Sequence, residues 1–478
     1  MTVSSEETPY MLSPLDHTIP KIYVAFFLSF PLETPEDGLR SLKKGITKLI
    51  QRLPVLAGDT ILRASAHGHK NVQFVQKPNE ETAAIPMLQV RHHSKLSLHE
   101  ISAQKVKSGV ESLRLADACT PLPDFISPLE RRPILRFAAN VMTDGILLAM
   151  SINHSFFDGG GAGAIMEALA ECCRTSDSDL SLPIFNLSDQ ASRGKLSSLG
   201  TTTGVEAADM DHSKQYNATG TIPCLSSGEW SGMMESFATS LTSCRLELSA
   251  SKLERLKTVC NQILALASCP DWPLYVSSND VLSALISICR NKCHDAHGGK
   301  ESELTTIVNM RRRVDPPCPD HYLGNMITAV HAPIPSSEPE LPVDLSRFDD
   351  LGLGREDLLR ITAAAARIRQ SILVVDDRHV RSLMGYLPKM HDWNAINMRS
   401  SDLSISSWRD WKVYGFDFGR HLGAISHFQM HFGLNGGLTV VMPAGGKIGA
   451  DWDIQLMIKS TDWPSLQSSH LFQWAFGA

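Results

Sequence analysis

One short stretch of the chain combines residue types that can move a proton. It runs from residue 151 to residue 161 and places His154 four residues before Asp158. An imidazole exchanges a proton near neutral pH, so His154 could act as a general base. Asp158 could orient the ring of His154, or it could pair with a distant arginine and hold the loop in shape. In a chain with 18 histidines, about one His followed four residues later by an Asp is expected by chance. The neighbouring sequence must therefore show whether this pair is functional.

The elements predicted around this stretch favour an exposed loop at the edge of a sheet. Residues 135–153 contain two apolar runs separated by the turn sequence at 143–145, which predicts a pair of hairpin strands. The second run ends directly before His154. Glycines at 159–161 let the backbone turn tightly before a helix predicted over 163–174. Such a loop presents a side chain in a cleft, which makes His154 a candidate catalytic residue.

Other chemistries fit the sequence less well. Gly159, Gly161 and Ala164 imitate a dinucleotide fingerprint, but five residues separate the end of the predicted strand from the first glycine. Neither a Gly-x-Ser-x-Gly elbow nor a Walker phosphate loop occurs in the sequence. We expect no metal, because the spacing of the nearest group of ligand types matches no closed zinc site, at Cys289, Cys293, His294 and His297.

Length and composition describe an ordinary large globular protein. The chain has 478 residues, enough for two or three domains, and 43% of them are apolar. Lys and Arg total 45 against 51 acids, a net charge of −6, so we expect no nucleic-acid partner. No apolar run approaches the ~20 residues that span a bilayer, and the start lacks a secretory-signal layout. With ten scattered cysteines, these features predict a cytoplasmic protein without membrane insertion.

The remaining pattern predicts a mixed α/β architecture in two domains. A strand is expected within 20–31 and a helix over 38–53, and residues 176–226 read as a polar connection. We therefore predict an N-terminal domain at 1–180, a crossover linker at 181–225 and a C-terminal domain at 226–478. In the second half we expect helices at 251–266, 279–290, 355–372 and 463–474 and strands at 305–309, 438–442 and 453–458.

Seven ordered stretches resemble the acyl-CoA-dependent acyltransferases called the BAHD family. The HxxxDG motif of that family matches His154, Asp158 and Gly159, and its DFGWG motif is similar to Asp417, Phe418 and Gly419 followed by Arg420 and His421. Five further matches occur in the same order as in the family, at residues 12–16 (LSxLD), 53–58 (PLAG), 277–280 (TSxE), 309–325 (DxRxR, PP and YFGN) and 407–408 (SW).

The resemblance implies both a fold and a reaction. The fold is two similar mixed-sheet domains of the chloramphenicol-acetyltransferase type, joined by a long crossover around a solvent channel, with residues 420–435 crossing back to the first domain. His154 would deprotonate an alcohol or amine acceptor for direct attack on acyl-CoA without an acyl-enzyme. The start of the motif looks like the fungal branch that includes trichothecene acetyltransferases, so we expect acetyl transfer to a specialised metabolite by a monomer.

The resemblance also implies roles for single residues. Asp158 would pair with Arg311 or Arg313, while Gly159, Asp417, Phe418 and Gly419 would shape their loops. Contacts to coenzyme A are expected from Ser277, Ser278, Arg313, Asn325 and Arg420.

Two positions depart from the family pattern. Arg420 replaces a tryptophan, so its guanidinium could support the oxyanion, or it could be a solvated residue. Asn309 replaces the aspartate of DxRxR, which weakens the expectation of the usual salt bridge for this loop.

Coenzyme A carries several phosphate charges, so an acidic chain that uses it must gather cations locally. We expect this at the channel mouth from Arg311, Arg312, Arg313, Lys412 and Arg420. Two alternatives share the motif: a scaffold that binds or cyclises an intermediate without a CoA donor, and a condensation enzyme that takes its acyl group from a carrier protein.

Overall fold

The hairpin predicted before His154 forms the centre of a five-stranded sheet in the computed structural model. Its strand order is β16 (His427–His431), β2 (Tyr23–Pro31), β9 (Gly145–Asn153), β8 (Leu135–Met142) and β5 (Leu88–His92). The pairs are antiparallel except β5 with β8. The structure describes residues 10–65, 68–175, 189–199, 210–218, 226–267, 269–294, 302–319, 321–337, 339–341, 344–431, 436–446 and 449–477.

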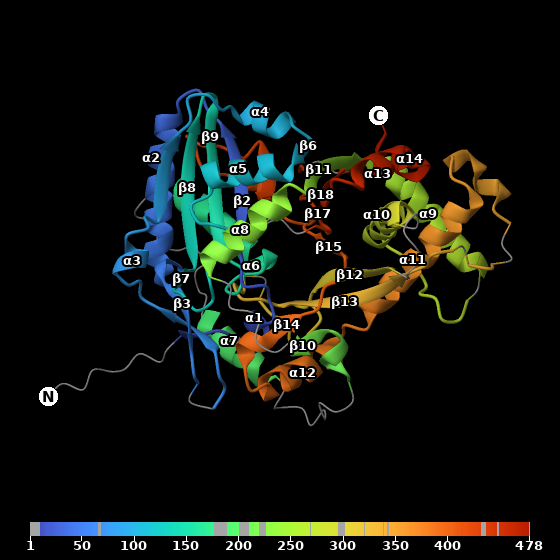
Figure 1. The fold of residues 1–478 in the computed structure, drawn as a ribbon, viewed down its shortest axis with the longest axis horizontal. Coiled ribbons are helices and arrows are strands. Elements are labelled where there is room, and N and C mark those ends of the chain that lie inside the picture. Colours follow the sequence, from blue (N-terminus) through green and yellow to red (C-terminus); the bar gives the residue numbers. More distant parts are fainter. Residues whose placement is uncertain are drawn as a thin grey trace.

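Alternation of apolar side chains explains how this sheet is covered. Phe26 and Leu28 of β2 belong to one core with α2 (Pro35–Arg52) and α6 (Gly159–Arg174), whereas Phe27 faces α4 (Leu98–Ala103) on the other side. Helix α2 runs along the outer face of the sheet in Figure 1. Both faces are buried, which is why β9 reads as a continuous apolar run ending at the site.

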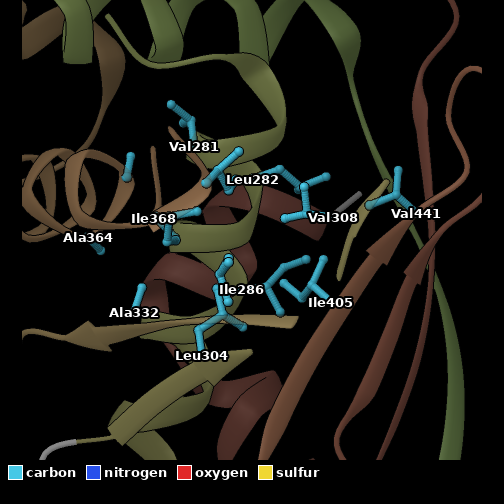
Figure 2. Close-up of a cluster of buried hydrophobic side chains, with 14 of the residues drawn as sticks. Val281, Leu282, Ile286, Leu304, Val308, Ala332, Ala364, Ile368, Ile405 and Val441 are labelled. Carbon is cyan, nitrogen blue, oxygen red and sulfur yellow. The ribbon is translucent and has the colours of Figure 1, made fainter. Parts of the chain in front are cut away.

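A seven-stranded sheet forms the second layer of the molecule. Its order is β13 (Ile327–Ile334), β12 (Ser302–Asn309), β15 (Leu403–Ser407), β17 (Leu438–Val441), β18 (Trp452–Lys459), β11 (Leu241–Leu248) and β6 (Val106–Ser108). Helices α10 (Ser278–His294) and α11 (Arg355–Leu373) pack on it. Figure 2 shows Leu282 and Ile286 of α10 meeting Leu304, Val308 and Ile405 of the sheet.

Each large sheet contains one strand from the other half of the chain. Strand β16, within the second half, pairs with β2 through a register that sets Phe428 opposite Leu28. Strand β6, within the first half, pairs with β11 at the edge of the seven-stranded sheet. The two halves are therefore joined by backbone hydrogen bonds as well as by side chains.

The other elements are shorter or lie at the periphery. A four-stranded sheet and a two-stranded sheet comprise β1 (Tyr10–Met11), β4 (Val72–Gln76), β3 (Asp59–Arg63), β7 (Arg132–Pro133), β10 (Tyr216–Ala218) and β14 (Ile396–Met398). The remaining α-helices among the described residues are α1 (Pro14–His17), α3 (Glu80–Ala83), α5 (Gly109–Cys119), α7 (Asp189–Ser198), α8 (Ser227–Ala238), α9 (Ala250–Ala267), α12 (Asp377–Tyr386), α13 (Trp463–Ser468) and α14 (His470–Phe476).

Two predicted helices differ from the structure. The helix expected over 163–174 begins at Gly159, because the carboxylate of Asp158 accepts from the backbone of Gly161 and caps the first turn. The single final helix expected over 463–474 is two helices, which Ser469 in extended conformation separates. Within the described residues, no helix is both long and apolar enough to cross a bilayer.

Candidate active site

His154 follows the last residue of β9 and is held in one orientation by its own loop. Its backbone N–H donates to Ile22 at 3.0 Å, and its Nδ1 lies 2.8 Å from the carbonyl oxygen of Phe157. A carbonyl only accepts, so Nδ1 carries the proton of the neutral ring and Nε2 keeps its lone pair. The tautomer that a general base requires at Nε2 is therefore set by the backbone of the loop.

Burial lowers the pKa of His154 below the ordinary histidine value, and the hydrogen bond to Phe157 and the negative charge of nearby Asp158 only partly oppose this. The protonated ring is inactive as a base, so a lowered pKa preserves activity toward acid pH. We expect kcat/KM, measured between pH 4.5 and 8, to reach half of its plateau value at a pH below about 6.5, the ordinary pKa of histidine. An acid limb centred above that value would contradict the assignment of His154 as a partly buried neutral base.

Asp158 is buried, and both oxygens of its carboxylate accept hydrogen bonds from other parts of the protein. Arg311 donates to both of its oxygens, at 2.7 and 2.8 Å, in a two-point ion pair. The backbone N–H groups of Gly161 and Met326 donate at 2.9 Å each. None of these contacts involves the ring of His154, so Asp158 fixes the loop and the first turn of α6, and it pairs with Arg311.

The glycines after Asp158 give room for the second half of the chain to approach. A Cβ on Gly161 would lie 2.1 Å from the carbonyl oxygen of Leu323, and one on Gly160 would lie 2.8 Å from the guanidinium carbon of Arg311. Neither glycine has a positive φ. The reason for glycine here is close packing between the two halves, and not the tight turn that the sequence suggested.

Asn325 lies behind the His154 loop and holds its backbone. Its Nδ2 donates to the carbonyls of His154 at 3.0 Å and Ser155 at 3.2 Å, and to Asp16 at 3.0 Å. Its backbone N–H also donates to Asp16, at 2.8 Å. The described contacts of Asn325 thus position the catalytic loop, and contact with coenzyme A remains a separate prediction.

Ser277 and Ser278 lie at the start of α10, as expected from the motif. Ser277 donates through its N–H and Oγ to Asp280 at 2.7 and 2.8 Å, and Asp280 is paired with Arg369. Ser278 is half-buried in the first turn. The Oγ of Ser277 also accepts from the backbone N–H of Asp280 at 3.3 Å and so caps the helix, while the backbone N–H groups of this turn form its electropositive end.

Arg313 caps a different helix. Its Nη1 donates to the carbonyls of Ile372 at 2.9 Å and Val375 at 2.7 Å, at the C-terminal end of α11. Burial beside Arg369 lowers its pKa. The contacts of Arg313 are consistent with a local structural role, and it does not pair with Asp158.

The second signature lies at the far end of α6. Asp417 accepts from the N–H of Gly419 at 2.8 Å, and buried Phe418 meets Phe30 edge-on at 4.9 Å between ring centres. Gly419 has φ +86°, and a Cβ there would be 3.1 Å from the Cα of Arg174, the last residue of α6. The motif therefore fastens this loop to the C-terminal end of the helix.

Arg420 is not brought together with His154. It is exposed, and its Nε lies 2.8 Å from Nε2 of His421. Helix α6 begins beside the catalytic loop and ends beside Gly419, so its 16 residues put about 22 Å between the two ends. An arginine side chain spans far less than this distance, so Arg420 cannot donate to an oxyanion at His154. Of the five cations expected at one channel mouth, Arg420 is thus separated from His154, while Arg311 is paired with Asp158 beside the loop.

We expect Arg420→Ala to transfer acyl groups at a rate within about twofold of the wild type, because exposed substitutions away from a site change little. Steady-state kcat with saturating donor and acceptor checks this. A tenfold loss in kcat in a folded variant would restore the catalytic role that the sequence suggested for this residue.

Two tryptophans beside the catalytic loop received no role from the sequence. Trp408 and Trp411 stack with 4.7 Å between ring centres and 8° between planes. A Cβ on Gly159 would lie 2.6 Å from Trp411 Cζ2 and 3.3 Å from Trp408 Nε1. The SW match at residues 407–408 was the only sequence signal for Trp408. The structure adds that the indole N–H of Trp408 lies against the HxxxDG loop, beside Gly159.

The mixed α/β fold thus places a histidine with an unprotonated Nε2 where the two halves of the chain meet, an arrangement suited to an enzyme that activates an acceptor for group transfer. The chain belongs to the Transferase family, whose model matches residues 3–469, and this is the BAHD family that the two signatures resemble. The protein is an acyltransferase of that family.

Similar proteins support this assignment over the whole chain. O-acetyltransferase pyr7 of Aspergillus fumigatus is 35% identical over 99% of this chain and 93% of its own length. Fumigaclavine B O-acetyltransferase easN of the same organism is 34% identical over 98% and 97%. The crystal structure of F. graminearum TRI101 complexed with coenzyme A and deoxynivalenol has a TM-score of 0.70 at 17% identity, with 98% and 99% coverage, which shows a shared fold.

Proposed function

We propose that the protein transfers an acetyl group from acetyl-CoA to a hydroxyl group of a fungal specialised metabolite, as a cytoplasmic monomer. The single observation that carries this proposal is the unprotonated Nε2 of His154, which the bond from Nδ1 to Phe157 leaves basic. The names of the relatives support acetyl as the acyl group and oxygen as the acceptor atom. An amine acceptor would use the same base.

The transfer proceeds in one complex of enzyme, donor and acceptor. Nε2 of His154 takes the hydroxyl proton as the acceptor oxygen bonds to the thioester carbonyl carbon. The carbonyl electron pair moves to oxygen and forms a tetrahedral oxyanion. When the pair returns, the C–S bond breaks, and the proton on His154 passes to the departing thiolate. The products are an ester and free coenzyme A, and no bond to the enzyme forms.

The oxyanion needs a donor, and our candidate is the indole N–H of Trp408. Its indole N–H forms no hydrogen bond with the part of the chain that the structure describes, and it lies beside Gly159 next to the catalytic loop. Preorganised donors of this kind contribute on the order of 10²-fold to kcat. We expect Trp408→Phe to lower kcat by about that factor with little change in KM, while an unchanged kcat would place the oxyanion elsewhere.

The start of α10 is our candidate for binding the phosphate or pantetheine part of coenzyme A. The N–H groups of a helix N-terminus attract anions, and Ser278 in its first turn is only half-buried. Among the cations predicted for this role, Arg313 caps α11 and Arg311 pairs with Asp158. These two cations are thus committed to other contacts, and the support for coenzyme A comes from the family.

The test is the mass of the product formed from acetyl-CoA and a panel of fungal alcohols and amines. An increment of one acetyl group on a single acceptor supports the proposal. Two alternatives predict other outcomes: a donor-free scaffold gives no thermal stabilisation by coenzyme A, and a carrier-dependent condensation enzyme gives product only with a carrier-bound acyl group.

A further inference from the structure

The segment predicted as a crossover linker supplies a buried arginine that no motif includes. Arg193 lies on α7, and only 2% of its side chain is exposed. Its Nη1 forms an ion pair with Oδ2 of Asp16, a residue of the LSxLD stretch that is also buried. A buried guanidinium must satisfy several donors, so its remaining contacts reveal what it holds in place.

Arg193 contacts the catalytic loop directly. Its Nη2 donates to the backbone carbonyl of Phe156 at 3.1 Å, and its guanidinium carbon lies 4.6 Å from the centre of the Phe156 ring. Phe156 immediately precedes Phe157, whose carbonyl orients the imidazole of His154. The arginine therefore holds the peptide next to the one that sets the tautomer of the base.

A second route connects Arg193 to the same loop through Asp16. The other oxygen of Asp16 accepts both bonds from Asn325, whose Nδ2 donates to the carbonyls of His154 and Ser155. Three successive carbonyls, at residues 154, 155 and 156, thus accept hydrogen bonds from side chains outside the loop. Arg193 makes one of these bonds and anchors the partner of the other two.

We propose that Arg193 is a positioning residue for His154, so that the crossover segment forms part of the catalytic apparatus. Arg311 holds the end of the loop at Asp158, and Arg193 holds its middle at Phe156. Arg193 itself touches no reacting atom. The inference rests on the proposed acyl transfer, in which His154 is the base.

The variant Arg193→Lys separates positioning from stability. A lysine keeps the positive charge beside Asp16, but its single ammonium group cannot reproduce a planar fork that donates to Asp16, Phe156 and the Tyr10 hydroxyl and stacks on a ring. Loss of accurate placement of a reacting group lowers the rate by as much as about 10²-fold. We expect kcat to fall at least about tenfold, with each KM and the melting temperature close to wild type. Lys195→Met, at an exposed position on the same helix, is the matched control and should leave all three unchanged.

A second readout reports the ring of His154 without requiring turnover. In ¹⁵N spectra of ring-labelled protein, with the signal assigned by its loss in His154→Gln, the wild type should show the Nδ1–H tautomer. We expect Arg193→Lys to give a mixture of tautomers. If that variant does not fold, the charge-neutral double variant Asp16→Asn/Arg193→Met takes its place, and the same change in tautomer is expected.

A folded Arg193 variant with wild-type kcat overturns the inference, and so does a fall in kcat with an unchanged tautomer. If the wild type transfers no acyl group, the proposed function fails instead, and the tautomer measurement alone decides whether Arg193 positions the ring.

Discussion

His154→Ala is expected to lower kcat for acyl transfer by about 10³-fold while leaving the protein folded. The variant removes the group that accepts the hydroxyl proton, and general bases contribute on the order of 10² to 10⁴ in rate. The ring of His154 is half-buried, and its Nδ1 makes a single hydrogen bond, to Phe157. Its removal therefore leaves the fold nearly intact. Thiol release from acetyl-CoA, followed with saturating acceptor, measures the effect.

The control for this result is an equally conservative change at a histidine outside the site. His470→Ala, at the start of α14 and remote in sequence from every motif, should retain wild-type kcat. If His154→Ala kept more than a tenth of the wild-type kcat, another group would have to be the base.

Arg311→Met is expected to be the most destabilising single substitution at the site. It leaves the Asp158 carboxylate buried beside two backbone donors but without its cation. Breaking a buried ion pair in this way costs about 3–5 kcal/mol. The denaturant midpoint should fall accordingly, and kcat should fall with it, because the loop loses the contact that joins it to the second half of the chain.

Two comparisons make this prediction specific. Arg312→Met changes the adjacent, exposed arginine and should shift the midpoint little. The double variant Asp158→Asn/Arg311→Met removes both charges and should recover part of the lost stability without recovering kcat. A single variant Arg311→Met as stable as the wild type would mean that Asp158 is not held as the structure shows.

Much of the frame around the site could be predicted from the sequence. The apolar runs at 135–153 predicted the β8–β9 hairpin, and helical spacing over 355–372 predicted α11, which ends one residue later. These are long elements with both a strong pattern and buried faces, so local sequence is enough to define them. The family motifs then identified His154 as the candidate base.

The structure adds contacts that depend on long-range packing. Strand β6 has three residues, too few for a periodic pattern, and it exists because the edge of β11 is available to pair with it. Arg193 lies in a polar segment that the sequence predicts as a linker. Its proposed role in positioning His154 follows only from its hydrogen bonds to Asp16 and to the Phe156 carbonyl. Arg420 is the opposite case: the sequence left a catalytic role and a solvated one open, and only the structure shows that the length of α6 separates its motif from His154.

The central claim is that His154 drives direct transfer from acyl-CoA to the acceptor without an acyl-enzyme. The measurement that tests it most directly is rapid-quench thiol release from acetyl-CoA by the wild type, with and without the acceptor. We predict release only when the acceptor is present, in equal amount to ester formed, and none above background in His154→Ala. A burst of thiol equal to the enzyme concentration without the acceptor, or undiminished release by His154→Ala, would contradict it.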